Sequence, residues 1–251
     1  MLEEWTEQHN EGVTSGDEKV WRETVAGALE GPVRARVRTY GGLPESAEIS
    51  LANPVFYVPR QDAYPKWFGV AALERSGSEE QQVLGVFVKK DAKGRWRAAH
   101  WLTFKGRPPQ LAQDREGYVP TAPDRGLPAA HAKFLRDGDQ SAIVPDAYSS
   151  NAREGDVGDW TVESEEVTVG PGASYALRTE DGGSMVWYGL QQEKVLTGGD
   201  GDTLPREVRD QLGGEPGGTL RTTWQWLVIG YAPPSGKGRV LGQSVSLIAA
   251  R

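Results

Sequence analysis

The three histidines of the sequence, His9, His100 and His131, are the side chains best suited to proton transfer near neutral pH. His100 lies in the strand-like segment 95–104, RWRAAHWLTF, where it could act as a general acid or base or pack as a neutral side chain. His131 falls on the apolar stripe of a predicted helix, and His9 has no identifiable partner. We therefore predict no catalytic residues and keep His100 as the weak candidate.

Alternation along the segment 95–104 predicts which side chains accompany His100. We expect His100 to be largely buried on the concave side of a first sheet. We expect no carboxylate within hydrogen-bond reach, because no His/acid motif is present. The residues expected on the same strand face are Trp96, Ala98, Leu102 and Phe104.

Other reactive patterns are missing from the sequence. It contains no cysteine, which excludes disulfides, thiol nucleophiles and cysteine-ligated metals. Asp200 and Asp202 lie in a Gly-rich stretch, 198–203, that lacks the later glutamate of a calcium loop. The stretch 213–219 has neither the lysine nor the preceding strand of a phosphate-binding loop. We predict neither a metal nor a cofactor.

Aromatic side chains are the least ordinary feature of the sequence, which has nine tryptophans. Most should be core residues, since a bent sheet packed on a helix needs large side chains. Those left on exposed strand faces could form a sugar- or lipid-stacking platform or a partner surface. The candidates for such a surface are Trp67, Trp96, Trp101, Trp187, Trp224 and Trp226.

The first half of the chain changes from helical to strand periodicity. Residues 15–29 have apolar side chains at helical spacing, and Ser15 with Glu18 forms a capping box, so a helix is predicted there. A short helix is also expected over residues 3–10, whereas residues 33–40 fit a helix or a strand. From residue 48 the pattern predicts an antiparallel meander of strands that ends near residue 104.

The Pro- and Gly-rich stretch 106–124 is predicted to be a linker, after which the pattern begins again. An apolar stripe from Leu127 to Leu135 predicts a helix, and several strands follow it. Within the strands, residues 198–218 are predicted to be an insertion that holds a short helix capped by Thr203.

The two halves share phrases in the same order. Residues 15–21 (SGDEKVW) correspond to 137–143 (DGDQSAI), 56–75 to 174–194, and 83–104 to 226–248. Three correspondences in one order predict a tandem repeat. The predicted fold is therefore α+β, with two cone-like domains in which an N-terminal helix packs on a bent antiparallel sheet. The predicted domains are residues 1–105 and 125–251.

Composition and charge narrow the classes of function. With 251 residues, 37% of them hydrophobic, the chain is long enough for two folded domains. The net charge is −7, and the second half is the more acidic, so nucleic acid and anionic membrane surfaces are disfavoured partners. No apolar run is long enough to span a membrane, and the N-terminus is acidic, so the chain as written is expected to be soluble.

The helix, the Gly-Asp turn and the strand order resemble the cone fold of nuclear transport factor two-like (cystatin-like, SnoaL-like) proteins. The phrases of residues 9–32, 56–73, 96–104 and 175–190 more narrowly resemble an actinobacterial family known as a domain of unknown function. Members of that family usually carry an N-terminal lipoprotein signal or membrane anchor. The resemblance thus implies a trimmed, extracytoplasmic domain, which would meet a membrane only through an anchor that this sequence lacks. It implies no catalytic residues.

Three classes of function remain open from the sequence, and one of them is a structural assembly module of a larger membrane-anchored complex. The first is a non-enzymatic binding or scaffold protein whose partner is a protein, a small molecule or an envelope ligand. The second is a SnoaL-like enzyme, a cyclase, isomerase or hydratase, that uses His100 with a carboxylate from elsewhere in the cone. A cone filled by its own aromatic side chains would favour the first, and an open cavity at His100 would favour the second.

Overall fold

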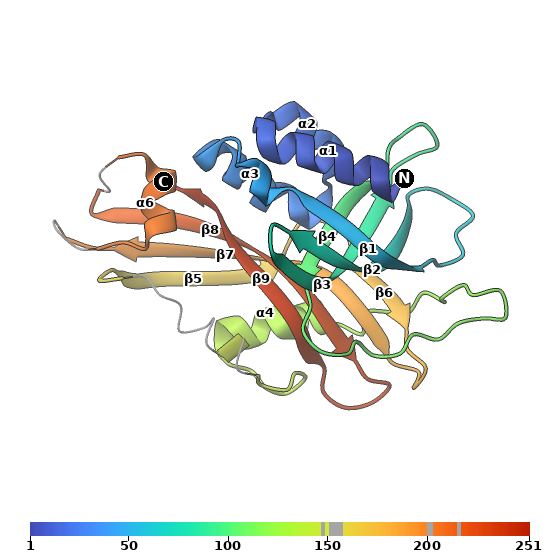
Figure 1. The fold of residues 1–251 in the computed structure, drawn as a ribbon. Helices are drawn as coiled ribbons and strands as arrows, with labels where there is room; N and C mark the ends of the chain where they lie inside the picture. Colours follow the sequence, from blue (N-terminus) through green and yellow to red (C-terminus); the bar gives the residue numbers. More distant parts are fainter. Residues whose placement is uncertain (147–148, 151–157, 200–202, 215–216) are drawn as a thin grey trace.

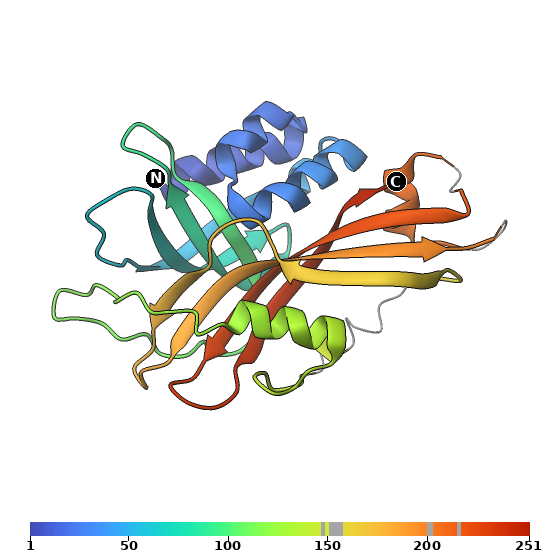
Figure 2. The same cartoon turned by 180° about the vertical axis from the view of Figure 1, so that it is seen from behind.

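The computed structural model describes residues 1–146, 149–150, 158–199, 203–214 and 217–251. It is an α+β fold with helices packed on two antiparallel sheets, which confirms the predicted fold class (Figures 1 and 2). The helices are α1 (Leu2–Ser15), α2 (Glu18–Thr24), α3 (Glu30–Tyr40), α4 (Leu127–Asp137) and α6 (Arg206–Leu212), with short 3₁₀ turns η1 (Gly27–Leu29) and η2 (Glu45–Ala47).

Most strands pair with the strand that precedes or follows them in the chain. The first sheet has the order β1-β2-β3-β4, and the second has the order β5-β7-β8-β9, with β6 also paired to β7. Every pairing between these strands is antiparallel. The strands are β1 (Ile49–Tyr57), β2 (Lys66–Ser76), β3 (Glu79–Lys89), β4 (Arg97–Thr103), β5 (Thr161–Val169), β6 (Tyr175–Arg178), β7 (Ser184–Thr197), β8 (Thr219–Ala232) and β9 (Arg239–Ala250).

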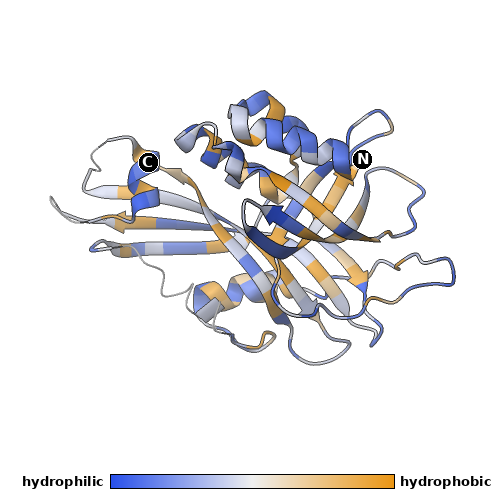
Figure 3. Ribbon diagram, in the orientation of Figure 1, coloured by the Kyte–Doolittle hydropathy of each residue, from blue (hydrophilic) through white to orange (hydrophobic). Residues whose placement is uncertain are grey.

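The layers stack as helix, sheet, sheet and helix (Figures 1 and 2). Helix α1 packs Trp5 on Phe68 and Phe87 of the first sheet, and α4 packs Phe134 on the far face of the second sheet. The inner faces of the two sheets meet in one apolar cluster that includes Leu84, Val86, Trp187 and Ile229. Hydrophobic segments accordingly concentrate in strands and at the layer contacts (Figure 3).

The helical start of the chain differs from the prediction. Ser15 does not cap a helix over 15–29; it ends α1, and Gly16 follows in the left-handed conformation with φ 65°. Asp17 caps α2 instead, because its side chain accepts a hydrogen bond from the Lys19 amide. A Cβ on Gly16 would lie 2.4 Å from the Gly42 backbone nitrogen, so only glycine allows this close chain approach. The segment 33–40, left open by the sequence, is helical within α3.

A β-bulge in β4 overturns the predicted strand face. Phe87 pairs with Ala98 and Val86 pairs with His100, so Ala99 is an extra residue in the strand. Ala98 and Trp96 consequently face α1 with Phe68, whereas His100, Leu102 and Phe104 face the second sheet. The expectation that Trp96 and Ala98 share the face of His100 was wrong, since strict alternation does not survive a bulge.

The second half contains the predicted helix and strands. Helix α4 ends at Gly138, which is left-handed like Gly16, so the corresponding phrases 15–21 and 137–143 both mark a helix C-terminus. Helix α6 begins after Pro205, and Thr203 does not cap it, because its hydroxyl donates to Asp159. Asp200 and Asp202 lie outside the described residues.

The stretch 106–124 forms no helix and no strand, only isolated β-bridges. It runs against the second sheet. Leu111 and Thr121 form single bridges to Thr179 and Leu177, and Val119 is buried between the sheets. Residues of both halves therefore share one core cluster. The division into domains at 1–105 and 125–251 stays a prediction.

Candidate functional site

A groove of about 560 Å³ lies at the end of the first sheet, where β1 stops and β2 and β4 begin. Aromatic side chains line it from β1, from β2, from the residue before β4 and from the stretch after β4, and we call it the aromatic groove. Its polar groups come from the loop 58–65, which joins β1 to β2, and from the first residue of β2. The aromatic residues are Phe56, Trp67, Phe68, Trp96 and Tyr118, and the nearest polar ones are Arg60, Gln61, Asp62 and Lys66.

The two indole rings of the groove are held by packing and remain partly exposed. Trp67 contacts Tyr175 of the second sheet, with ring centroids 5.2 Å apart. Trp96 meets the buried ring of Phe68 edge to face at 4.9 Å. Phe56 adds a ring that is 42% exposed. The groove thus offers aromatic surface whose position is set by the core rather than by a ligand.

Gln61 fixes the loop 58–65 against the start of β2. Its amide oxygen accepts from the Trp67 backbone at 2.9 Å, and its amide nitrogen donates to the Trp67 carbonyl at 2.6 Å. The side chain takes the place of a neighbouring strand at this position. Because both ends of the amide are engaged, Gln61 shapes the groove and has little capacity left for a ligand.

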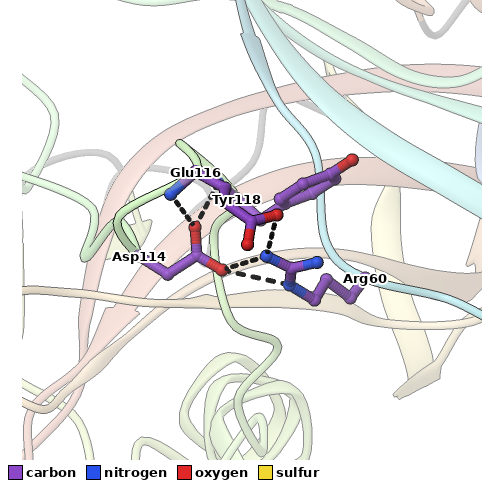
Figure 4. A network of polar contacts seen from close by, with 4 residues as sticks. All are labelled: Arg60, Asp114, Glu116 and Tyr118. Carbon is purple, nitrogen blue, oxygen red and sulfur yellow. Dashed lines mark hydrogen bonds and ion pairs between the residues drawn. The ribbon is translucent and has the colours of Figure 1, made fainter.

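Arg60 ties the loop 58–65 to the segment 114–118 (Figure 4). Its guanidinium donates two hydrogen bonds to Asp114 and one to Glu116, at 2.9–3.0 Å, and lies 4.1 Å from the centre of the Tyr118 ring. The hydrogen bonds to Glu116 and Asp114 raise the pKa of Arg60. Desolvation opposes ionisation of Asp114, yet hydrogen bonds from Arg60 and backbone amides hold the pKa of that carboxyl below its usual value. The arginine charge is therefore already neutralised.

The other candidate tryptophans lie away from the groove. Trp187 and Trp226 are buried, 0% and 1% exposed, and have no surface for stacking on a ligand. Trp101 is half-buried and donates from Nε1 to the Glu74 carboxylate at 2.6 Å. Trp224 is also half-buried, beside the α6 end of the second sheet. Of the six candidates, only Trp67 and Trp96 line the aromatic groove, Trp67 from the side of the second sheet and Trp96 from the side of α1.

His100 is buried between the two sheets, with 1% of its surface exposed and the Tyr175 ring 6.0 Å away. Its Nδ1 has no hydrogen-bond partner within the described residues. Burial alone lowers the pKa of His100 to about 3, so the ring is neutral at physiological pH. It lines neither the aromatic groove nor the four other pockets found with it, which measure about 260–530 Å³.

His131 takes part in a closed polar chain beneath α4. Its Nδ1 lies 3.0 Å from the Tyr188 hydroxyl and its Nε2 lies 3.1 Å from the Ser149 hydroxyl, and all three side chains are buried. Burial lowers the pKa of His131 to about 4. Both ring nitrogens have partners, and His131 lines none of the five pockets described here, so this network stabilises the helix–sheet contact. His9 packs between the Trp5 and Trp21 rings.

A pocket of about 370 Å³ between α2, α3 and β4 is rimmed by charges that pair with one another, as Glu18 does with Arg22 and Glu23 with Arg97. Across the described residues, no group of three His, Asp or Glu side chains could hold a metal ion. None of the helices described is long and apolar enough to cross a membrane.

Sequence reasoning missed Arg60, Gln61 and Tyr118. Arg60 and Gln61 follow a predicted strand, and Tyr118 lies in a stretch interpreted as a linker. Only the fold brings these positions together, since 54 residues separate Arg60 from Asp114. One signal in the sequence could have located the groove. In an antiparallel meander the ends of alternate strands meet at one edge of the sheet, and here aromatic and polar residues occur at those strand ends.

The fold and the groove define an α+β protein with an aromatic surface site. The chain belongs to the family described as a domain of unknown function (DUF8094), whose model matches residues 1–251. It is 25% identical over 276 residues to an uncharacterized lipoprotein of Streptomyces coelicolor, covering 100% of this chain and 83% of the relative. It is 24% identical over 234 residues to an uncharacterized lipoprotein of Streptomyces avermitilis, covering 84% and 70%.

No solved structure matches the chain. The family and its relatives confirm the resemblance to actinobacterial proteins of unknown function that include lipoproteins.

Proposed function

We propose that this protein is a non-enzymatic binding protein of the cell envelope, whose aromatic groove holds a carbohydrate. The observation that supports it is that Trp67 and Trp96, both partly exposed, line one groove of about 560 Å³. That volume lies within the range of small-ligand sites. Core packing presets the rings, so little ordering of the site opposes binding.

The chemistry of the groove suits a sugar. One face of a pyranose presents C–H groups that pack on an aromatic ring, while its hydroxyls need donors and acceptors around the edge. Asp62 and Lys66 supply both at the groove, and Asp62 is exposed. Arg60 is paired to two carboxylates, which removes the strong positive field that a phosphate-rich polymer would need.

Location and architecture form part of the same proposal. Because the relatives are named as lipoproteins, we propose that this protein lies outside the cytoplasmic membrane. In its full-length form it would be anchored to that membrane. We also propose that the halves are tandem nuclear transport factor two-like cones. The corresponding stretches 56–75 and 174–194 both form antiparallel hairpins, β1–β2 and β6–β7, and 83–104 and 226–248 overlap β3–β4 and β8–β9.

A SnoaL-like enzyme is the weaker proposal. It needs His100 to face a substrate and a carboxylate, whereas the Nδ1 atom has no partner and the ring is enclosed between the sheets. A buried neutral imidazole without access serves packing.

Calorimetric titration with neutral and anionic oligosaccharides tests the carbohydrate proposal. Trp67→Leu and Trp96→Leu keep an apolar side chain but remove the flat ring, so each should weaken saccharide binding at least roughly tenfold, about 1.4 kcal/mol. Trp224→Leu, a half-buried tryptophan away from the groove, is the matched control and should bind normally. Circular dichroism confirms that each variant folds. If no saccharide binds, or if the control loses binding equally, the proposal fails.

A further inference from the structure

The aromatic groove continues into a second groove between α1 and the edge strand β1. This helix groove has a volume of about 530 Å³, and Met1 and Phe56 line both grooves. The two sites therefore adjoin at one aromatic ring. Each alone has the volume of a small-molecule site, so together they present a longer track than one sugar ring requires.

The walls of the helix groove are tied together. The Asn10 side chain of α1 donates to the Ile49 carbonyl and accepts from the Ile49 amide of β1, both at 2.9 Å. Trp5, on the same helix, is buried against Phe87 and donates from Nε1 to the Thr24 carbonyl. The spacing between helix and strand is thus set before any ligand binds.

The chemistry of the helix groove continues that of the aromatic groove. Its apolar surface comes from Leu2, Leu51 and Phe56, and its polar edge comes from Glu3, Glu7 and Ser50. No lysine or arginine is among the residues that line it in the described chain. Hydroxyl groups can donate to the carboxylates, whereas a polyanion would be repelled by them.

The form of β1 argues against a peptide as the occupant. A peptide that binds along a sheet edge needs a continuous row of backbone donors and acceptors. Here the register shifts between Ala52 and Val55, Asn53 has φ 51°, and Pro54 has no amide hydrogen. These features block strand addition over the middle of β1.

We infer that the ligand is a linear, neutral oligosaccharide that spans both grooves. The inference rests on the proposed carbohydrate function and adds chain length and charge to it. Sugar rings at one end lie in the aromatic groove that Trp67 and Trp96 line, and the chain passes Phe56 to lie between α1 and β1. Affinity therefore rises with the number of sugar units until the helix groove is filled.

The test measures affinity against chain length, with β-1,4- and α-1,4-linked glucose oligomers of two to six units as probes. Ser50→Trp fills the helix groove from an exposed strand position, and Ser164→Trp makes the same change on the exposed edge strand β5. In the wild type and in Ser164→Trp, the longest oligomer of the bound linkage should bind roughly tenfold tighter than the shortest. In Ser50→Trp that gain should disappear, while the shortest oligomer binds as before.

The possible results distinguish an extended ligand from a carbohydrate site that is confined to the aromatic groove. Binding that is independent of length, or a length dependence that Ser50→Trp leaves intact, overturns the extended ligand but leaves a carbohydrate site at the aromatic groove. Tighter binding of anionic than of neutral oligomers of equal length overturns the assignment of charge. Absence of binding by every glucose oligomer in the wild type overturns this inference, and the proposed function falls with it if the saccharides of the calorimetric titration also fail to bind.

Discussion

At the scale of residues, the titratable imidazoles of this protein are enclosed rather than poised for chemistry. Burial lowers the pKa of His100 to about 3, and it lowers the pKa of His9 and His131 to about 4. For His9 the positive charge of Arg36 adds to the effect of burial. An imidazole that stays neutral down to pH 4 cannot exchange protons with a substrate near neutrality, but it makes folding depend on pH.

Replacement of His100 by leucine tests this dependence. The unfolded chain protonates His100 near pH 6.5, whereas the folded chain holds it neutral down to about pH 3. The part of the unfolding free energy that depends on a neutral His100 is therefore fully present above pH 6.5. It is lost as the pH falls from 6.5 toward 3, at about 1.4 kcal/mol per pH unit. In His100→Leu the slope of unfolding free energy against pH should decrease by that amount between pH 6 and 4. Urea unfolding at a series of pH values measures it.

The same variant separates packing from catalysis. Because Nδ1 is buried without a partner, an apolar replacement of similar size should leave stability at pH 7 nearly unchanged. Ligand binding should also be unaffected. Loss of saccharide binding in a folded His100→Leu protein, or an unchanged pH slope, would contradict the role assigned to His100.

At the scale of elements, the segment 106–124 is more than a spacer. Its turn at 114–118 forms part of the aromatic groove through Tyr118, and Arg60 holds that turn to the loop 58–65 (Figure 4). The ion pairs are exposed, so their net stabilisation is small and depends on salt. Their main effect is local order at the groove.

Limited trypsin digestion tests this attachment, because Arg115 is exposed within the turn. Arg60→Gln should accelerate cleavage after Arg115, and 1 M salt should move the wild type toward the variant. Arg75→Gln is the control, since Arg75 pairs with Glu80 inside the β2–β3 hairpin. Mass spectrometry identifies the first fragments. Equal rates in wild type and Arg60→Gln, or first cleavage within 48–104, would show that the turn is held by other contacts.

At the scale of the whole molecule, the two sheets share a core. Leu84 and Val86 of the first sheet pack in one cluster with Met185 and Trp187 of the second. This cluster decides whether the predicted domains are independent folding units. Two halves that bury one apolar face against each other should unfold together.

Met185→Ala tests that expectation. Met185 is fully buried, so the substitution should cost about 2–5 kcal/mol. Hydrogen exchange should then accelerate equally in β3, at Leu84, and in β8, at Val228, because global unfolding exposes both. If exchange accelerates in β8 alone, the halves unfold independently and the domain boundaries at 105 and 125 mark separate folding units.

From the sequence alone, local residue patterns determined the positions of several strands and of one helix. Strand alternation located the meander, and apolar spacing located the helix at Leu127–Asp137. Shared phrases predicted two similar halves, which stays a prediction. These features depend on residues within a few positions of one another, where periodicity and turn preference act directly. Trp67 and Trp96 were candidates for the same reason, because large aromatic residues stand out on a strand.

The tertiary structure alone decided the rest. The bulge at Ala99 reversed the face of Trp96, and the approach of Gly16 to Gly42 separated α1 from α2. The pairing of Arg60 with Asp114 joined a loop to a distant turn. Each depends on contacts between segments far apart in the chain, whose energies outweigh local preference by small margins. The aromatic groove exists because strand ends that are remote in sequence meet at one edge of a sheet.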